Sequence, residues 1–212
     1  MRRATANTKS GAMPHLGATV WFTGLPASGK STIARLVFVQ LQERGIPAEL
    51  LAGAEVRESL SRGLSFNRRD REEHLRRIGY VAKLLSRNGV VAVCTAVSPY
   101  RATRDEIRRN VTTFVEVFVD CPPDVAEQRD TAGRYVRARR GELLDFTGVN
   151  APFEPPVAPE VHVHSDMESA EEAASKVLRT LELLGIIPTS PEAERSAHED
   201  EIRRRLAGLG YV

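Results

Sequence analysis

Gly24-Leu-Pro-Ala-Ser-Gly29-Lys30-Ser31 is the stretch of this 212-residue chain that decides its fold. The spacing Gly-x-x-x-x-Gly-Lys-Ser is typical of a phosphate-binding loop, whose glycines let successive backbone N–H groups meet phosphate oxygens. A strand-type run at residues 18–23 precedes the loop, and helical apolar spacing follows Lys30. An ordinary glycine turn before a helix is the alternative interpretation. The strand–loop–helix context favours the phosphate loop, and hence a site for ATP.

We expect every residue of this loop to contact the nucleotide. Lys30 would reach the β and γ phosphates, while the Ser31 hydroxyl would ligate Mg²⁺, the expected cofactor. The predicted ATP contacts in the loop and directly after it are Gly24, Leu25, Pro26, Ala27, Ser28, Gly29, Lys30, Ser31 and Thr32.

Further strands and helices alternate along the chain. Strand-type runs occur at residues 48–51, 90–96, 113–119 and 161–164, and helical spacing occurs from Lys30 to Gly45 and at residues 70–87 and 122–129. A last helix, capped by Ser165 or Asp166, is expected to reach about Leu184. The alternation predicts an α/β, three-layer P-loop kinase fold with a parallel sheet and helices on both faces.

Three segments depart from this alternation. Residues 1–17 show no periodicity and are expected to form a mobile arm before a single domain at residues 18–185. Residues 131–156 are polar, basic and interrupted by glycine and proline, which indicates a mobile lid. Residues 186–212 are expected to form a tail with a short amphipathic helix at 201–209, which could dock on the body or on a second subunit.

Bulk composition excludes several classes of protein. The chain is 42% hydrophobic and 27% charged, with a net charge of +2, so neither disorder nor nucleic-acid binding through a bulk basic field is expected. No apolar run approaches the roughly 20 residues of a membrane span, and the basic N-terminus lacks the apolar stretch of a signal peptide. Two cysteines, Cys94 and Cys121, fit a reducing compartment, so we expect a cytoplasmic protein.

Two local clusters could suggest other binding sites. His162 and His164 alternate on a short strand, but with no third ligand nearby a solvated strand face is a better interpretation than a metal site. The arginine-rich run at residues 134–140 lies inside the expected lid. Contacts with small anionic nucleotides explain that run better than a nucleic-acid patch does.

Four segments carry a resemblance to a known family. They are Trp21-Phe-Thr-Gly-Leu-Pro-Ala-Ser-Gly-Lys-Ser-Thr; Leu64-Ser-Phe-Asn-Arg-Arg-Asp-Arg71 followed by Arg76-Arg-Ile-Gly79; Ser98-Pro-Tyr-Arg101; and, around the lid, Arg129-Asp130, Gly133-x-Tyr135, Asp145-Phe-Thr-Gly-Val149 and Phe153-Glu-Pro-Pro156. Over these segments the chain resembles adenylylsulfate (APS) kinases, which use ATP to phosphorylate the 3′-hydroxyl of adenosine 5′-phosphosulfate. The resemblance implies this activity, with 3′-phosphoadenosine 5′-phosphosulfate (PAPS) and ADP as products, a homodimer, and a functional link to ATP sulfurylase.

The resemblance also implies roles for individual residues. Phe66 and Phe146 resemble two aromatic faces that sandwich the adenine of APS, although core phenylalanines are the alternative. Arg57 and Arg71 resemble clamps on the phosphosulfate, for which a solvated helix face is the alternative. Ser98 would hydrogen-bond the acceptor nucleotide, and Arg129 would pack near the base or phosphates of ATP. The APS contacts implied in this way are Arg57, Phe66, Arg71, His74, Val97, Ser98, Arg137, Phe146, Thr147 and Gly148.

The chain departs from the family's pattern after the second strand. The family has Asp-Gly-Asp where this chain has Ala52-Gly53-Ala54, and the two aspartates are expected to position Mg²⁺ and to orient the 3′-hydroxyl. Glu55 is adjacent, but on an extended segment its side chain would point to the opposite face. His74 replaces an asparagine, and Val136 replaces a lysine of the lid. The catalytic rate is therefore expected to suffer, while the fold and the ATP site survive.

Three functions remain open from the sequence. The first is APS phosphorylation, impaired by Ala52 and Ala54, which are either deliberate substitutions or the residues of a natural paralogue. The second is a nucleotide-binding protein that no longer catalyses and acts as a regulatory or assembly partner. The third is a P-loop kinase with a different acceptor, as His74 and Val136 would permit.

Overall fold

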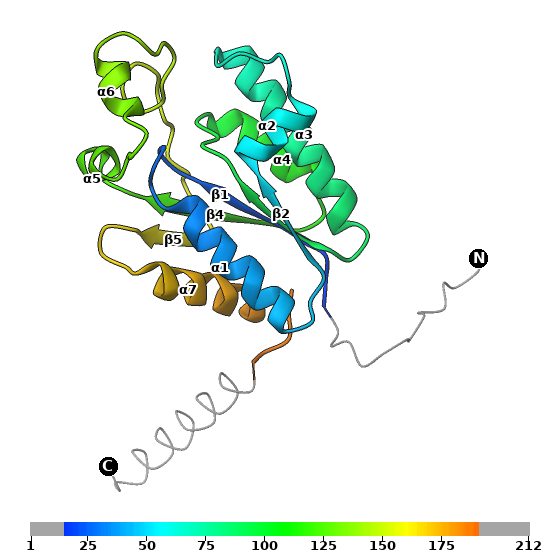
Figure 1. Cartoon of the computed structure of the whole chain (residues 1–212). Helices are drawn as coiled ribbons and strands as arrows, with labels where there is room; N and C mark the ends of the chain where they lie inside the picture. The colour runs from blue at the N-terminus through cyan, green and yellow to red at the C-terminus, as the bar shows by residue number, and fades with distance from the viewer. Residues whose placement is uncertain (1–14, 191–212) are drawn as a thin grey trace, which may run out of the picture.

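The computed structural model describes residues 15–190 (Figure 1). The predicted helix at residues 201–209 and residues 1–14 of the predicted arm lie outside this range.

A five-stranded parallel sheet forms the centre of the molecule. Its strands are β1 (Ala18–Thr23), β2 (Ala48–Ala52), β3 (Val91–Thr95), β4 (Phe114–Asp120) and β5 (Val161–His164), in the order β2-β3-β1-β4-β5. Central β1 is buried on both faces, with Val20 and Phe22 in one core and Trp21 in the other. The predicted α/β fold with a parallel sheet is therefore confirmed.

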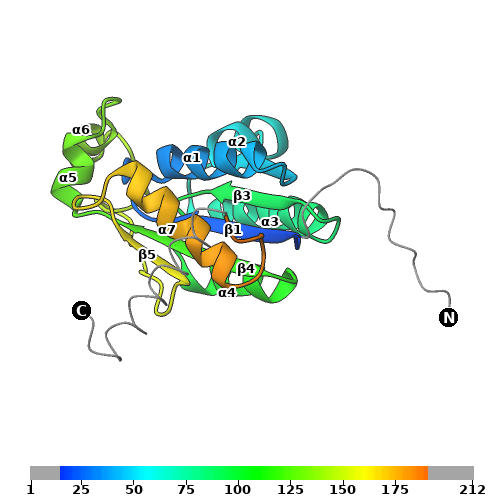
Figure 2. The ribbon, with the colours of Figure 1, turned by 90° about the horizontal axis from the view of Figure 1, so that it is seen from below.

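Helices cover both faces of this sheet. α1 (Lys30–Glu43) and α7 (Ala170–Leu183) pack against each other over one face, and α2 (Gly53–Leu60), α3 (Arg68–Ser86) and α4 (Arg101–Asn110) supply the core on the other. α5 (Pro123–Gln128) and α6 (Arg134–Arg139) lie close together at one end of the molecule, beyond the end of β4 (Figures 1 and 2). That end carries the phosphate loop, so the fold places the predicted lid beside it.

Three local predictions need correction. Residues 53–60 form helix α2, so the expectation that Glu55 lies on an extended segment is wrong. The last helix begins at Ala170 rather than after Ser165 or Asp166, because Ser169 and Glu172 form a reciprocal capping box there. The helices α2, α4 and α6 were not predicted.

The packed body extends slightly beyond both boundaries expected from the sequence. The Leu16 backbone N–H donates to the Ile186 carbonyl oxygen at 2.8 Å, and the Ile186 and Ile187 side chains are buried in the core next to α7. Within residues 15–190, no helix is long and apolar enough to cross a membrane.

Candidate active site

The phosphate loop turns sharply between β1 and α1. Gly24 has a φ of 147°, and a Cβ there would lie 2.3 Å from the Val119 carbonyl oxygen, so only glycine fits. Gly29, with a φ of 93°, is the N-cap of α1, and Ala27 between them also has a positive φ. The loop therefore leads into the N-terminus of α1, where free N–H groups and the helix dipole favour an anion.

Lys30 lies inside this loop and is almost fully buried. Its Nζ donates to the Leu25 carbonyl oxygen at 2.5 Å and to Ser28 Oγ at 3.2 Å. Burial, together with the nearby charge of Arg134, lowers the pKa of Lys30 from 10.5 to about 7. A bound phosphate would restore the charged form, so this lysine is poised to respond to an anion.

One pocket of about 1070 Å³ joins the phosphate loop to the predicted acceptor residues. Six cations line it, against two carboxylates, so it suits an anionic ligand. The predicted residues that line it are Pro26, Ala27, Ser28, Gly29, Lys30, Ser31, Thr32, Ala52, Ala54, Arg57, Phe66, Arg71, His74, Val97, Ser98, Arg129, Arg137, Phe146 and Thr147.

Two aromatic rings reach the pocket from different elements. Phe66 lies just before α3 and is 58% exposed, with the Arg57 guanidinium 4.5 Å from its ring centre. Phe146 lies in the lid and meets Tyr135 edge-on at 5.0 Å. The Tyr135 hydroxyl donates to the Pro26 carbonyl oxygen at 3.0 Å, which ties the lid to the phosphate loop. Phe66 is therefore not a core residue, which removes the alternative interpretation for that ring.

Arg71 connects two walls of the pocket, the segment before α3 and the lid, at the end where the acceptor residues were predicted. Its Nε donates to the Phe66 carbonyl oxygen and its Nη1 to Thr147 Oγ1, both at 2.5 Å. The guanidinium is thus shared between the segment before α3 and the lid. Arg137 reaches the same pocket from α6 and pairs with Glu142 at 3.4 Å.

Ser98 does not have the free hydroxyl that the sequence led us to expect. Its buried Oγ accepts a hydrogen bond from Trp21 Nε1 at 3.0 Å and donates to Thr23 Oγ1 at 2.9 Å. The Thr23 hydroxyl in turn donates to the Val97 carbonyl oxygen at 2.9 Å. Ser98 therefore lines the pocket, and its hydroxyl is engaged in fixing the loop after β3.

His74 is a buried, neutral ring. Its Nδ1 lies 2.9 Å from Ser61 Oγ. Burial, and then the charge of Arg57, lower the pKa of His74 from 6.5 to about 4. The His74 imidazole consequently adds no positive charge to the pocket at neutral pH.

Arg129, which was predicted, lines the pocket near the loop between β5 and α7, together with several residues that were not predicted. Arg129 Nη2 donates to the Ser165 carbonyl oxygen at 2.9 Å, which places its guanidinium beside the loop between β5 and α7. Residues 165, 168 and 169 of that loop and Ala170, the first residue of α7, line the pocket, and so do Leu143 and Leu144 of the lid and Arg134 of α6. The arginine-rich run was the one signal for Arg134. The loop was missed because it was assigned to the last helix.

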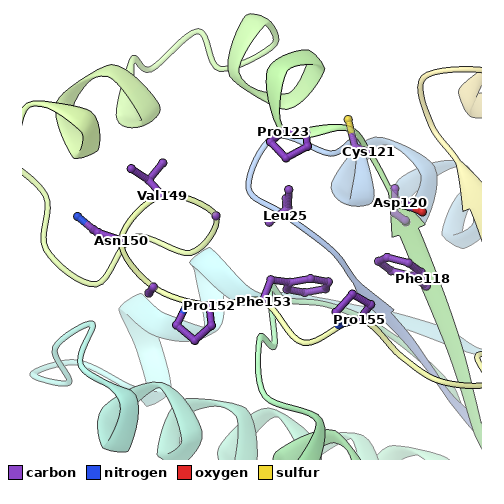
Figure 3. A pocket seen from close by; sticks show the side chains of 13 residues that line it. Leu25, Phe118, Asp120, Cys121, Pro123, Val149, Asn150, Pro152, Phe153 and Pro155 are labelled. Carbon is purple, nitrogen blue, oxygen red and sulfur yellow. The ribbon is translucent and has the colours of Figure 1, made fainter.

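Three predicted residues lie outside this pocket. Leu25 and Gly148 line a second pocket of about 630 Å³, between the end of β4 and residues 148–155 (Figure 3), and Gly24 lines neither of the two. A Cβ at Gly148 would lie 3.0 Å from Leu25 Cδ2, so these two residues pack on each other. Gly24 and Gly148 thus serve backbone geometry, as their positive φ values also indicate.

Comparison with known proteins decides the family. The family model described as adenylylsulphate kinase matches residues 16–164. A curated adenylyl-sulfate kinase from Gloeothece citriformis (strain PCC 7424) is 47% identical over 175 residues, which cover 82% of this chain and 99% of the relative. The chain belongs to the adenylylsulphate kinase family.

Further relatives support this assignment. A probable bifunctional SAT/APS kinase 2 from Sorangium cellulosum (strain So ce56) is 48% identical over 172 residues, which cover 81% of this chain and 30% of that relative. Among solved structures, the APS kinase CysC of Mycobacterium tuberculosis, in complex with AMPPNP and APS, matches with a TM-score of 0.76. It is 40% identical, and the match covers 80% of this chain and 99% of that one. The protein is therefore a P-loop kinase by family and by fold.

The two alanines, Ala52 and Ala54, stand at the carboxyl end of β2, inside the pocket. Ala52 is the last residue of β2 and the N-cap of α2, and Ala54 lies in the first turn of α2. Both line the pocket, whereas Glu55 does not. Glu55, the adjacent carboxylate in the first turn of α2, therefore does not replace the two aspartates expected at positions 52 and 54.

Within the described residues, the two carboxylates that line the pocket are already engaged. Asp130 accepts from Arg134 Nε and from the Tyr135 backbone N–H, each at 2.9 Å. Glu168 accepts from the His164 backbone N–H at 2.7 Å and pairs with Lys176 at 3.2 Å. The hydroxyl of the exposed Ser31, at the start of α1, could serve as a protein ligand for a magnesium ion here. The donor set fits Mg²⁺ only as an ion held mainly by phosphates and water.

Proposed function

We propose that this protein transfers the γ-phosphoryl group of ATP to the 3′-hydroxyl of APS, giving PAPS and ADP, at a rate limited by Ala52 and Ala54. The observation that carries the proposal is the single pocket that joins the phosphate loop to Phe66, Arg71 and Phe146. A chain that had lost this acceptor has no chemical need for that constellation. The related Mycobacterium tuberculosis enzyme, in complex with AMPPNP and APS, supports the same pair of ligands.

ATP occupies the end of the pocket built by the phosphate loop and the loop after β5. The α1 N-terminus and Lys30 hold its β and γ phosphates, and Arg129 lies toward its base. The adenine of APS stacks between Phe66 and Phe146, and Arg57, Arg71 and Arg137 neutralise its phosphosulfate. Arginine suits this task because a planar guanidinium binds two anionic oxygens at once.

The reaction itself depends on placement and charge. The 3′-oxygen attacks the γ-phosphorus in line, a new O–P bond forms, and the bond to the β,γ-bridging oxygen breaks to release ADP. Lys30 stabilises the charge that develops on the leaving group. Ser31 would help to hold Mg²⁺, which would supply further charge neutralisation at the phosphates. The hydroxyl proton must pass to solvent or to the transferred group, because no uncommitted carboxylate lines the pocket in the described residues. Because no such carboxylate is available to take the proton, we expect slow turnover, whereas ATP and APS should still bind.

A second candidate function is a nucleotide-binding protein that does not catalyse. Ala52 and Ala54 favour it, since both carboxylate positions are lost while the anion site is kept. A kinase with another acceptor is the third candidate, and His74 favours it. A homodimer, a functional link to ATP sulfurylase and a cytoplasmic location belong to the first proposal. The bifunctional Sorangium relative supports the link.

The test combines binding with single-turnover chemistry. APS is titrated into the protein with saturating ADP by calorimetry, and enzyme in excess is then mixed with APS, Mg²⁺ and γ-labelled ATP, with the nucleotides separated by chromatography. We expect APS to bind and labelled PAPS to form slowly. Phe66→Ala should weaken APS binding by about 1–3 kcal/mol, whereas Tyr80→Ala, at an exposed ring of α3 outside the pocket, should not. Absence of APS binding would contradict the proposal, and binding without product would favour the non-catalytic alternative.

A further inference from the structure

The exposed edge of the sheet carries a cluster of side chains that the kinase reaction does not use. β5 is the last strand of the sheet, and His162 and His164 lie on the same side of it, two residues apart. The sequence supplied no third ligand for this pair. The fold does, because Asp120 at the end of β4 is the register partner of His164.

The three side chains converge on a small volume. His162 Nε2 lies 3.1 Å from Asp120 Oδ2, and His164 Nδ1 lies 4.0 Å from the same oxygen. All three ligand atoms lie within 4.8 Å of one another. Ligands of a tetrahedral zinc ion at about 2.0–2.1 Å are separated by about 3.3 Å, so small rotations of these side chains would suffice.

Neighbouring groups hold the cluster in place. The His162 ring stacks on Phe118 at 5.0 Å, and Phe118 stacks on Phe153 at 5.9 Å. The Asp120 carbonyl oxygen accepts from the Ser165 backbone N–H at 2.9 Å, which fixes the ends of β4 and β5 together. Such support for ligand orientation is what a metal site requires beyond its ligands.

We propose that Asp120, His162 and His164 bind a zinc ion, at a site separate from the nucleotide pocket. Two imidazoles and one carboxylate favour Zn²⁺ over Mg²⁺ or Ca²⁺, which prefer oxygen ligands. Three protein ligands leave a fourth position for water or a further ligand. None of the three residues lines the nucleotide pocket, whereas Asp120 lines the second pocket, where Figure 3 shows it at the end of β4.

The site is coupled to the nucleotide pocket through a short path. Ser165 follows His164 directly, and its carbonyl oxygen and Oγ accept from Arg129 at 2.9 and 3.5 Å. The Ser165 hydroxyl also donates to the Asp120 carbonyl oxygen at 3.1 Å. A metal ion at this edge would therefore stiffen the segment that positions Arg129.

The experiment measures metal binding by the full chain at pH 7.5, because a metal ion competes with protons for its imidazole ligands. Zn²⁺ affinity is obtained by competition with a chromophoric chelator, and Co²⁺ is added as a spectroscopic probe of coordination. We expect one Zn²⁺ per chain at this site, a rise in Tm with Zn²⁺, and visible Co²⁺ absorption of low-coordinate geometry.

Three variants and one control decide the assignment. Asp120→Asn, His162→Gln and His164→Gln should each weaken Zn²⁺ binding by roughly tenfold or more and remove the Co²⁺ band. Asp105→Asn, at an exposed carboxylate of α4 outside the cluster, should leave both unchanged. Circular dichroism without metal shows whether each variant is folded. Zn²⁺ affinity and Co²⁺ absorption that persist in all three folded variants would overturn the proposal.

Discussion

Lys30 shows how a single side chain can be held ready for a phosphate. Its ammonium group is buried within the loop, where it donates to Leu25 and Ser28, and burial lowers its pKa to about 7. The nucleotide-free protein therefore carries a cost for charging this lysine that the bound phosphates would offset. Since the folded pKa lies below the unfolded value of 10.5, this contribution makes the free protein more stable as pH rises from about 7 towards 10.

This pKa leads to a prediction about proton uptake. At pH 8, Lys30 should gain up to about one proton when ADP binds, because the phosphates raise its pKa again. Calorimetry in two buffers with different ionisation enthalpies measures that uptake. Lys30→Arg is the matched variant, because an arginine side chain stays charged. This variant should bind ADP without taking up a proton at position 30. If the unmodified protein and Lys30→Arg took up the same number of protons, a group other than Lys30 would be the one that gains the proton.

Much of the candidate site could be predicted because its residues lie in short, distinctive segments. The phosphate loop is recognisable from spacing alone, and Phe66, Arg71 and Phe146 lie in segments that resemble a family. The role of Ser98 could not be predicted, because nothing local to it indicates that Trp21 and Thr23 lie beside its hydroxyl. These contacts join residues that are distant in sequence, and they arise from the pairing of β1 with β3.

At the scale of secondary structure, the strands were predicted better than the short helices. The buried strands are continuous apolar runs, and α1 and α3 have long apolar stripes. α4 has few apolar residues to mark its buried face, and Thr103 and Arg104 are among its buried residues. The Ser169–Glu172 capping box was readable in the sequence and would have placed the start of α7 correctly.

Arg104 joins α4 to three other segments. Its Nε donates to Glu116 Oε1 on β4 at 2.7 Å, and its Nη atoms donate to the carbonyl oxygens of Ser98 at 2.6 Å and Glu154 at 2.7 Å. Both the Arg104 and Glu116 side chains are buried. This one side chain therefore fixes the loop after β3 and the end of the predicted lid.

Removal of Arg104 should destabilise the whole domain. Arg104→Met leaves Glu116 with only the partly exposed Arg108 as a partner, and should cost about 3 kcal/mol in free energy of unfolding. Urea denaturation measures this loss. Arg109→Met, on the exposed side of the same helix, should cost less than about 0.5 kcal/mol. The combined change Arg104→Met and Glu116→Leu should recover part of the stability, and no recovery would argue against an unpaired buried charge as the cause.

At the scale of the whole molecule, the predicted lid at residues 131–156 is attached to the body at several points, and three of them lie beside the nucleotide pocket. Tyr135 contacts the phosphate loop, Thr147 accepts from Arg71, and the Glu154 backbone N–H donates to the Pro99 carbonyl oxygen at 2.8 Å. All three of these contacts involve residues that line the nucleotide pocket, because Pro26, Thr147 and Pro99 each belong to its lining. Ligands in the pocket are therefore expected to order the lid and to exclude water from the transferring group.

Hydrogen exchange tests this expectation. ADP and APS together should slow the exchange of amides in residues 131–147 by roughly tenfold or more, because the ligands favour the closed lid. Amides of α4, none of whose residues lines the pocket, provide the internal reference and should not change. Equal exchange of the lid with and without both ligands would contradict a ligand-driven closure.

The central claim is that this protein keeps the ligand sites of its family but lacks the carboxylates that support catalysis. A direct measurement compares single-turnover PAPS formation by three proteins: the chain with Ala52 and Ala54, the double variant Ala52→Asp/Ala54→Asp, and an uncharged control, Ala52→Asn/Ala54→Asn. We predict that the aspartates raise the rate by orders of magnitude, that the asparagines do not, and that ADP affinity changes little in either variant. Equal rates in all three proteins, with APS and ADP bound, would contradict it.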